Sequence, residues 1–483
     1  MAEGTFMGPG PRMPECNLPS LDQDSFAART GCSHPSPGHQ GNPMKKKTDP
    51  NQTKTKTTQP PAEGRQGNVK AGLESYLAPP PSSKGRSIGI DCHPDTFTWA
   101  VLTGTTLHDA RQLECHADRP LLALLDWAAA CGTPDDTFLM EAGSNSFEVC
   151  RRLHALGLRA YVLESAHVGR HAALHCDNDK IAAVRIAKVY LIGGAPCVWQ
   201  PDPVTAGRRE LLHAHQSAVS DHTAATNALK GYLNQFTVRP GKQSMATAAF
   251  ATWLGRQRAW TPLQQALLDD HLLQIKTQKA RRDTLRRLIA LQISQEPLML
   301  RLMKILGIGL INAFALLATI GDIHRFARPE QLVAYLGLSP GQRQSGQGKN
   351  IRLGVRKRGR GDLRHLLIQG AHAVLRMGRD TALGKWGWKL FARKGQRNIA
   401  VTAVARKMVV QVWHQLMGHA PNAAESEKSL ALKLRNLAVL LGKKLRAELA
   451  LPGTLDDCLA HFLQKLHPLP ADGPMPLEKN PGA

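Results

Sequence analysis

Three acidic residues in the first half of the chain stand where carboxylates are unusual. Asp91 ends the run SIGID and Glu141 ends the run TFLME, both typical of buried strands, and Asp179 opens a later helical segment. Strands disfavour Asp, and burying a charged group is costly. Because neighbouring strands and a following helix can bring their ends to one edge of a sheet, we expect these three catalytic candidates to converge.

Three converging carboxylates cannot all stay ionised in a dry cleft unless a cation holds them. Oxygen ligands select Mg²⁺ or Mn²⁺, so Asp91, Glu141 and Asp179 are candidate metal ligands. Two such ions about 4 Å apart would stabilise the attacking and leaving oxygens of a phosphodiester. In the alternative interpretation the acids are structural: Asp91 caps a turn, Glu141 pairs with an Arg, and Asp179 is a helix N-cap.

A second candidate site surrounds Ser345, in a segment whose small and polar residues are typical of an exposed loop. Between residues 341 and 364 the chain has eight Lys or Arg and one Asp. A hydroxyl nucleophile that attacks a phosphodiester needs positive charge on the non-bridging oxygens, which planar Arg forks supply. The alternative is a loop that only binds phosphate and contains an ordinary serine. The candidate nucleic-acid-binding residues here are Arg343, Lys349, Arg352, Arg356, Lys357, Arg358, Arg360 and Arg364.

Gly307 and Gly309 precede an apolar helical segment and resemble the turn of a helix-hairpin-helix. In that motif, backbone N–H groups at a glycine turn and a helix N-terminus hold a phosphate without reading bases. The alternative is a tight turn between two core helices.

The charge of the whole chain favours a polyanionic partner. Lys and Arg number 62 against 38 Asp and Glu among 483 residues, a net charge of +24. Release of condensed counterions rewards a basic protein that neutralises phosphates, so DNA is the first candidate partner. An anionic membrane surface is the rival, and a mere aid to solubility is the third option. The longest charge-free apolar stretch, near residues 305–321, is too short and Gly-rich to span a membrane.

The nine cysteines are scattered and form no CxxC pair, which argues against a zinc ribbon and a disulfide framework. The adjacent pairs Cys92-His93 and Cys115-His116 lack ligand spacing and are interpreted as structural. This pattern fits a reducing cytosol, and no signal peptide is visible. We therefore expect a cytoplasmic protein.

The order of elements predicts an α/β domain over residues 86–204. Strands are expected at 87–91, 97–102, 106–113, 137–141 and 160–163, and helices at 119–131, 147–156 and 179–192, an order that indicates a mixed sheet. Residues 1–85 are rich in Pro, Gly, Ser, Thr and Lys and are expected to be a disordered basic arm. That arm either touches nucleic acid or is a passive tail or a mis-annotated start.

Helical patterns continue beyond this domain. Residues 205–296 contain two long segments, 206–236 and 263–291, which predict an antiparallel, coiled-coil-like arm that pairs with a second copy or lies along nucleic acid. Residues 297–420 form a second compact unit, mainly α-helical. Residues 421–483 are expected to hold one helix, near 427–450, and a disordered Pro-rich tail.

Taken together, these motifs make the chain similar to the DEDD-type transposases of the IS-one-ten family of bacterial insertion sequences. The N-terminal match includes GID at 89–91, MEAG at 140–143 and NDKI at 178–181. The C-terminal match includes YLGLSP at 335–340, SG at 345–346, KRG at 357–359 and AVARK at 403–407. The two blocks occur in the same order and cover about half of the chain.

The resemblance implies a RuvC-like, RNase H-type domain followed by a family-specific transposase domain, in a bacterial protein associated with the nucleoid. It implies Mg²⁺ at the acidic residues, a serine that becomes covalently linked to DNA, an element-encoded guide RNA, and a homo-oligomer, either a dimer or a tetramer. Carried over by position, Asp91, Glu141 and Asp179 match the first three acids and Ser345 matches the serine.

The sequence departs from the family at the fourth acid, which should come three residues after Asp179. That position holds Ala182, which cannot bind metal. Either three acids suffice, or Asp177 or Asn178 reaches the site, or the metal site is impaired.

The predicted function is therefore a transposase that excises and inserts an insertion sequence by DNA strand cleavage and exchange, guided by RNA. A metal-dependent, structure-selective nuclease in which Ser345 is incidental is one alternative. A decayed, non-catalytic nucleic-acid-binding protein, suggested by Ala182, is the other.

Overall fold

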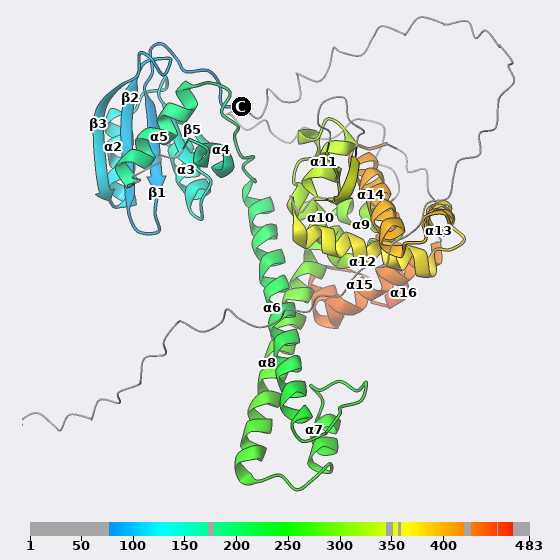
Figure 1. Ribbon diagram of the computed structural model, residues 1–483. Helices are drawn as coiled ribbons and strands as arrows, with labels where there is room; N and C mark the ends of the chain where they lie inside the picture. The colour runs from blue at the N-terminus through cyan, green and yellow to red at the C-terminus, as the bar shows by residue number, and fades with distance from the viewer. Residues whose placement is uncertain are drawn as a thin grey trace, which may run out of the picture. The chain divides into compact units, whose positions relative to one another are not determined.

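The computed structural model describes residues 77–171, 178–343, 351–355, 359–419, 427–451 and 453–466. Its first part is a five-stranded sheet with the order β3-β2-β1-β4-β5 (Figure 1). β1 pairs antiparallel with β2 and parallel with β4, so the predicted mixed sheet is confirmed. The strands are β1 Ser87–Cys92, β2 Phe97–Thr103, β3 Arg111–Arg119, β4 Thr137–Glu141 and β5 Arg159–Leu163.

Helices cover both faces of this sheet, because side chains alternate between the two faces along each strand. Ile88 and Ile90 of β1 are buried in one apolar cluster with α2 (Leu121–Cys131) and α3 (Ser146–Ala155). Leu139 of β4 faces the other way and packs with α4 (Ser165–Gly169) and α5 (Asp179–Leu191). Figure 1 shows α5 lying across one face of the sheet, and this is the face opposite α2 and α3.

Two local differences from the predicted elements have clear causes. β3 begins at Arg111 rather than near residue 106, because the Asp109 carboxylate accepts hydrogen bonds from the backbone N–H groups of Thr105 at 3.2 Å and Thr106 at 2.7 Å and closes a turn. Residues 77–85, expected to belong to the disordered arm, pack against the sheet region, where Ala78 is buried and donates a hydrogen bond to Ala195 O. The rest of that predicted arm, residues 1–76, lies outside the described residues.

A buried ion pair fastens the start of β1 to the start of β4. The Asp136 carboxylate, 1% exposed, lies 2.7 Å from Arg86 Nη2 and also accepts hydrogen bonds from the backbone N–H groups of Arg86 and Thr133. Burial opposes ionisation of Asp136, but these hydrogen bonds outweigh it and lower the pKa of the carboxyl below its ordinary value of 3.8.

Replacing Asp136 by Ala is therefore expected to lower the free energy of unfolding by about 3 kcal/mol at pH 7, because it leaves Arg86 unpaired. A depressed carboxyl pKa stabilises the fold above the ordinary value and loses that effect as pH falls through the folded-state value. The free energies of unfolding of wild type and variant in urea should thus begin to converge below about pH 4, and should meet only below the folded-state pKa of Asp136. Asp135→Ala, at the exposed neighbouring residue, is the control; an equal loss in both variants would contradict the assignment.

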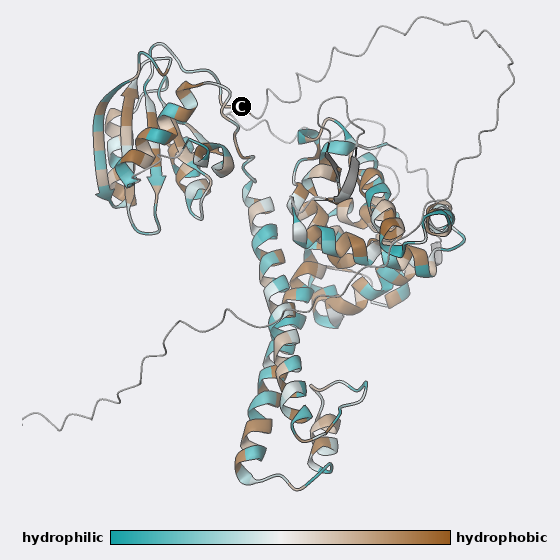
Figure 2. Ribbon diagram, viewed as in Figure 1, coloured by the Kyte–Doolittle hydropathy of each residue, from teal (hydrophilic) through white to brown (hydrophobic). Residues whose placement is uncertain are grey.

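The middle of the chain forms the predicted helical arm. α6 (Pro203–Asn234) and α8 (Pro262–Gln295) run antiparallel, since Arg208 near the start of α6 pairs with Glu296 just after α8, at 3.0 Å. A short helix not predicted from the sequence, α7 (Ala248–Gly255), packs against both through Phe250 and Leu254. Figure 2 shows apolar and polar residues alternating along α6 and α8.

The C-terminal part is mainly helical and surrounds a single large apolar cluster. α16 was not predicted, yet its Cys458 and Phe462 are buried in that cluster, because α15 and α16 pack on the same core. In the described part of the chain, no helix is both long enough and apolar enough to cross a membrane. The elements are α9 Pro297–Leu302, α10 Leu310–Ile320, η1 Ile323–Arg325, α11 Pro329–Tyr335, β6 Pro340–Arg343, β7 Ile351–Val355, α12 Gly361–Met377, α13 Ala382–Lys394, α14 Arg397–Leu416, α15 Glu427–Glu448 and α16 Leu455–Gln464.

Candidate functional site

The first candidate site begins at the end of β1. Because Ile88 and Ile90 face α2 and α3, the intervening Gly89 and the following Asp91 face α5. A Cβ atom on Gly89 would lie 2.0 Å from Ala183 O and 2.8 Å from Ala187 N. Only glycine therefore lets the backbone of α5 approach β1 this closely, and this approach brings the first turn of α5 to the end of β1.

Asp179 is the first residue of α5 and lies next to Asp91. Asn178 is the N-cap, since its Oδ1 accepts a hydrogen bond from Ile181 N at 3.0 Å. The alternative role of Asp179 as an N-cap is thus wrong. The same contact occupies the Asn178 side chain, so the suggestion that Asn178 replaces the fourth acid is not supported. Asp177, the other suggested substitute, lies outside the described residues.

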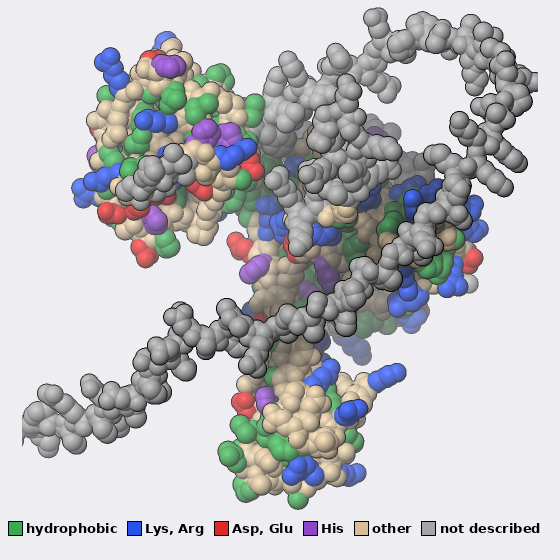
Figure 3. Space-filling view, viewed as in Figure 1, with side chains coloured by type: hydrophobic (Ala, Val, Ile, Leu, Met, Phe, Trp, Pro, Cys, Tyr) green, Lys and Arg blue, Asp and Glu red, His purple; other side chains and the backbone are tan. Residues whose placement is uncertain are grey.

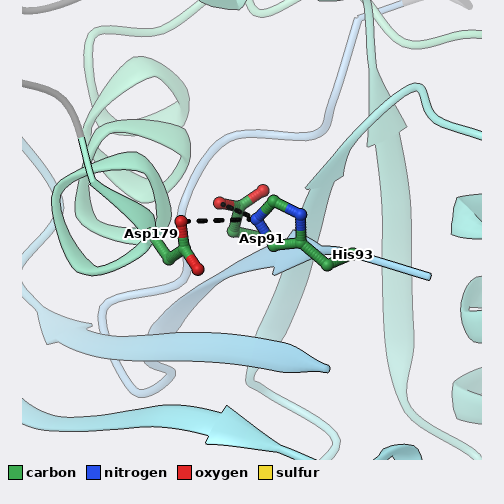
Figure 4. A group of neighbouring side chains, drawn as sticks. All are labelled: Asp91, His93 and Asp179. Atoms are coloured by element: carbon green, nitrogen blue, oxygen red, sulfur yellow. Dashed lines mark ion pairs between the residues drawn. The ribbon is translucent and has the colours of Figure 1, made fainter. Parts of the chain in front are cut away.

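A third side chain, which the sequence interpretation had assigned a structural role, completes this cluster. His93 Nε2 lies 3.5 Å from Asp91 Oδ2 and 3.3 Å from Asp179 Oδ1 (Figure 4). One ligand atom from each residue lies within 4.8 Å of the other two. The side chains of Asp91, His93 and Asp179 are 24%, 47% and 42% exposed, so an ion from solvent can reach them.

Backbone contacts fix the position of His93. Its N–H donates to Thr96 O at 3.0 Å, and its carbonyl accepts a hydrogen bond from Asn145 Nδ2 at 2.7 Å. The signal in the sequence was its place two residues after Asp91, which on an extended strand is the same face. Cys92, between them, packs against the opposite apolar cluster, and burial raises the pKa of its thiol to about 12.

Glu141 ends β4, the parallel neighbour of β1, where Met140 pairs in register with Ile90. The alternation that places Leu139 on the α5 face places Glu141 there as well. Its carboxylate is not part of the close group formed by Asp91, His93 and Asp179. The structure therefore brings two of the three predicted acids into one group and places the third at the end of the neighbouring strand.

Ala182 follows one helical turn after Asp179 and is 9% exposed. Its methyl group offers no ligand, so α5 presents a single carboxylate to the cluster in its first turn. The fourth acid expected from the family resemblance is therefore not supplied by α5.

Most of the predicted serine-bearing site lies outside what the structure describes. Ser345, Lys349, Arg356, Lys357 and Arg358 are outside the described residues, and the side chains of Arg343 and Arg352 are as well.

Two predicted phosphate-binding residues near that segment have internal partners. Arg360 Nη2 lies 2.8 Å from Asp362 Oδ2, and the hydrogen bond to Asp362 raises the pKa of Arg360. Arg364 Nη1 donates to Gly337 O at 3.1 Å. Both contacts hold the start of α12 in place, and phosphate binding by these two residues stays a prediction.

The two glycines of the predicted phosphate turn differ in their surroundings. Gly307 has φ +83°, and a Cβ there would lie 2.5 Å from Gly370 O of α12, so packing of the C-terminal core requires glycine at this position. Gly309 is the N-cap of α10, and no atom lies within 4 Å of the Cβ position there. Packing alone thus explains Gly307, and the predicted phosphate contact at both glycines stays a prediction.

A basic surface that the sequence interpretation missed lies on α13 and its neighbours. From 376 to 407 the chain has nine Lys or Arg and one acid, Asp380. Lys385, Lys389 and Arg393 are exposed and follow one another at intervals of four residues, hence on one helix face. Figure 3 shows Lys and Arg side chains gathered on this part of the C-terminal region.

An aromatic ring lies within this basic surface, which we name the α13 face and define by Arg379, Lys385, Trp388, Lys389 and Arg393. Four of these residues, all except Arg393, line an open hollow of about 380 Å³. The Arg379 guanidinium lies 4.7 Å from the centre of the Trp388 ring, whose Nε1 donates to the carbonyl of α12 residue Leu375 at 2.9 Å. A fixed ring among cations is a combination typical of nucleic-acid contacts.

Comparison with known proteins places the chain in a family. Residues 299–384 match the model described as "Transposase IS116/IS110/IS902 family". The chain is 33% identical over 294 residues to the "Probable family 20 transposase" of Pseudomonas aeruginosa, covering 57% of this chain and 82% of that protein.

Two further relatives have similar coverage. The "Transposase for insertion sequence element IS1111A" of Coxiella burnetii is 28% identical over 280 residues, covering 57% of this chain and 76% of that protein. "Putative transposase y4qE" of Sinorhizobium fredii is 26% identical over 302 residues, covering 57% and 74%. The predicted family is thereby confirmed: the chain belongs to the IS116/IS110/IS902 family of transposases.

Proposed function

We propose that this transposase moves an insertion sequence by cleaving and rejoining DNA strands with a metal-binding acidic site and a serine nucleophile, guided by an RNA. The observation that carries the proposal is the convergence of Asp91 and Asp179, from β1 and α5, on one accessible cluster. The sheet that positions them has the strand order and helix placement expected of an RNase H-like domain, which supports that assignment as well.

The residues of the cluster fit a divalent cation by the chemistry of their donors. Asp91 and Asp179 offer carboxylate oxygens from two elements, and Glu141 offers a third from the neighbouring strand end. A bound Mg²⁺ or Mn²⁺ would supply positive charge for the oxygens of a phosphodiester that gain charge during cleavage. The chain's own part is to hold these carboxylates together, which the contact of α5 with Gly89 does.

Ser345 is the proposed nucleophile. Its Oγ forms a bond to the phosphorus atom while the bond from phosphorus to a deoxyribose oxygen breaks, and the hydroxyl proton leaves for solvent or the departing oxygen. The basic residues of segment 341–364 would offset the charge on the non-bridging oxygens. The product is a DNA end attached to the protein, which conserves the energy of the phosphodiester for rejoining.

The proposal is tested by asking whether a covalent adduct forms. Wild-type protein, incubated with labelled DNA carrying the element's own ends, should give a protease-sensitive adduct under denaturing conditions. Ser345→Ala should abolish the adduct and retain DNA binding, whereas Ser339→Ala, the control six residues earlier in the chain, should retain both. An adduct that persists in Ser345→Ala would reject the serine role. Free ends without attached protein would favour the nuclease, and no cleavage by wild type would favour a decayed protein.

DNA or RNA backbone is the proposed partner of the α13 face. Affinity falls as salt concentration rises, and each phosphate neutralised makes the slope of log affinity against log salt concentration more negative by about 0.9. Replacing Lys385, Lys389 and Arg393 by Gln should therefore weaken duplex binding and make that slope shallower by up to about 2.7, as measured by fluorescence anisotropy at several salt concentrations.

The control removes the same charge from another surface. Arg435, Lys443 and Lys444 are exposed on α15, and their replacement by Gln should leave the salt slope unchanged. Equal slopes in the two triple variants would show that net charge alone, and not the α13 face, determines binding.

The guide RNA and a second copy of the chain are the remaining proposed partners. RNA that copurifies with the protein should, when sequenced, map beside the gene. Leu263, Leu267 and Leu273 on α8 are exposed, which supports pairing of the arm with a second copy. A monomer at micromolar concentration in sedimentation would reject that pairing.

A further inference from the structure

We propose that His93 is a metal ligand of the acidic site through Nε2, and that its nitrogen shifts the preference of the site from Mg²⁺ toward first-row transition ions, for which Mn²⁺ serves as the spectroscopic probe. This inference rests on the proposed function, because it needs a metal at Asp91 and Asp179. It adds a residue that neither the sequence interpretation nor the family resemblance assigned to the site.

The first support is the position of the imidazole between two carboxylates from different elements. His93 Nε2 lies at nearly equal distances, 3.5 Å and 3.3 Å, from one oxygen of Asp91 and one of Asp179. Ligands at right angles around an ion with bonds of about 2.1 Å lie about 3 Å apart. Two of the three ligand-atom separations are close to this value and the third is within 4.8 Å, and Figure 4 shows Nε2 pointing toward both carboxylates.

The second support is the way in which the loop holds His93. The backbone N–H of His93 donates a hydrogen bond to Thr96 O, and the backbone C=O of His93 accepts one from Asn145 Nδ2, so both contacts hold its main chain. Asn145 stands at the start of α3, in the loop that follows Glu141, so the same contact ties the two strand ends together. These contacts hold the main chain of His93, and Nε2 of its ring faces the two acids.

The third support is the ligand deficit on α5. Ala182, one turn after Asp179, offers no donor. The first turn of α5 therefore supplies a single carboxylate, that of Asp179. An imidazole from the β1 end supplies a neutral nitrogen donor instead of a further negative charge. Oxygen ligands suit both Mg²⁺ and Mn²⁺, but affinity for a site with a nitrogen donor rises along the first-row transition series from Mn²⁺ onward, so one imidazole shifts the preference of the site from Mg²⁺ toward the transition ions.

The competing explanation is that a protonated His93 forms an ion pair with the two acids and never binds metal. The two explanations differ in what a bound Mn²⁺ ion contacts. Electron spin-echo envelope modulation of Mn²⁺ in the full-length protein detects a directly bonded ¹⁴N nucleus. We expect that signal in the wild type, and its loss in His93→Gln together with a fall in Mn²⁺ affinity of about tenfold or more. Affinity for Mg²⁺ should fall less.

Controls separate this inference from the proposed function on which it rests. His108→Gln, at an exposed histidine of the same domain, should keep both the nitrogen signal and the affinity. Asp91→Asn and Asp179→Asn should each weaken Mn²⁺ binding. If these two variants bind Mn²⁺ as wild type does, the metal site itself is wrong. If they weaken binding but the wild type gives no nitrogen signal, or His93→Gln keeps it, only the role of His93 is overturned.

Discussion

Replacing Asp91 by Asn is expected to slow DNA strand cleavage by about two to three orders of magnitude while leaving the fold intact. Asn keeps the size of the side chain and one oxygen but removes the negative charge that attracts a divalent cation. Asp91 is 24% exposed and lies one residue before the end of its strand, so the substitution creates no cavity in the core. Single-turnover cleavage of DNA carrying the element's own ends, with Mg²⁺ and with Mn²⁺, measures the effect.

The control variant changes Asp95, four residues after Asp91. Asp95 is exposed in the turn between β1 and β2, and Asp95→Asn should cleave at the wild-type rate. DNA affinity should be similar in all three proteins, because the loss concerns cleavage and not binding. Wild-type cleavage by Asp91→Asn would remove the acidic site from the mechanism and leave Ser345 to act without it.

The sequence predicts the position of Asp91 well because its evidence is local. Alternation along β1 and β4, together with a helix that starts at Asp179, is enough to place three acids near one sheet edge. The same local patterns also gave the two long helices of the arm within a few residues of their ends. Where periodicity extends over many residues, neighbouring positions support one another and the prediction is secure.

The missed features depend on contacts between distant segments. His93 was interpreted as structural because the chain around it lacks the spacing of metal ligands. Its partner Asp179 is distant in the sequence and is brought close only by the packing of α5 on β1. The α13 face was missed because its exposed cations are unremarkable until Trp388 is seen fixed among them. Likewise α16 follows a Pro-containing segment and is short, so only burial of Phe462 in the C-terminal core reveals its role.

Gly89 illustrates how one such contact controls the whole site. A residue between two buried isoleucines of a strand would ordinarily be β-branched, and glycine there weakens a strand. The structure explains the choice, since α5 backbone atoms occupy the space that a side chain would need. The residue that positions the carboxylates is therefore one that carries no chemistry itself.

Replacing Gly89 by Ala is accordingly expected to have a large effect on both stability and metal binding. The new methyl group would lie 2.0 Å from Ala183 O, a backbone atom that moves only if the helix moves. Overpacking of this kind costs about 3 kcal/mol in the free energy of unfolding. Displacement of α5 would also carry Asp179 away from Asp91 and His93, so affinity for Mn²⁺ should fall by about tenfold or more even where the protein remains folded.

Gly231→Ala provides the matched control, because Gly231 is exposed within α6 and no atom lies within 4 Å of its Cβ position. Alanine there should stabilise the helix by about 0.5 to 1 kcal/mol and leave Mn²⁺ binding unchanged. Urea unfolding and Mn²⁺ titration of the three proteins separate the two effects of Gly89→Ala. If that variant lost stability but bound Mn²⁺ like the wild type, the ligands would be held by their own loops and not by the close approach of α5 to β1.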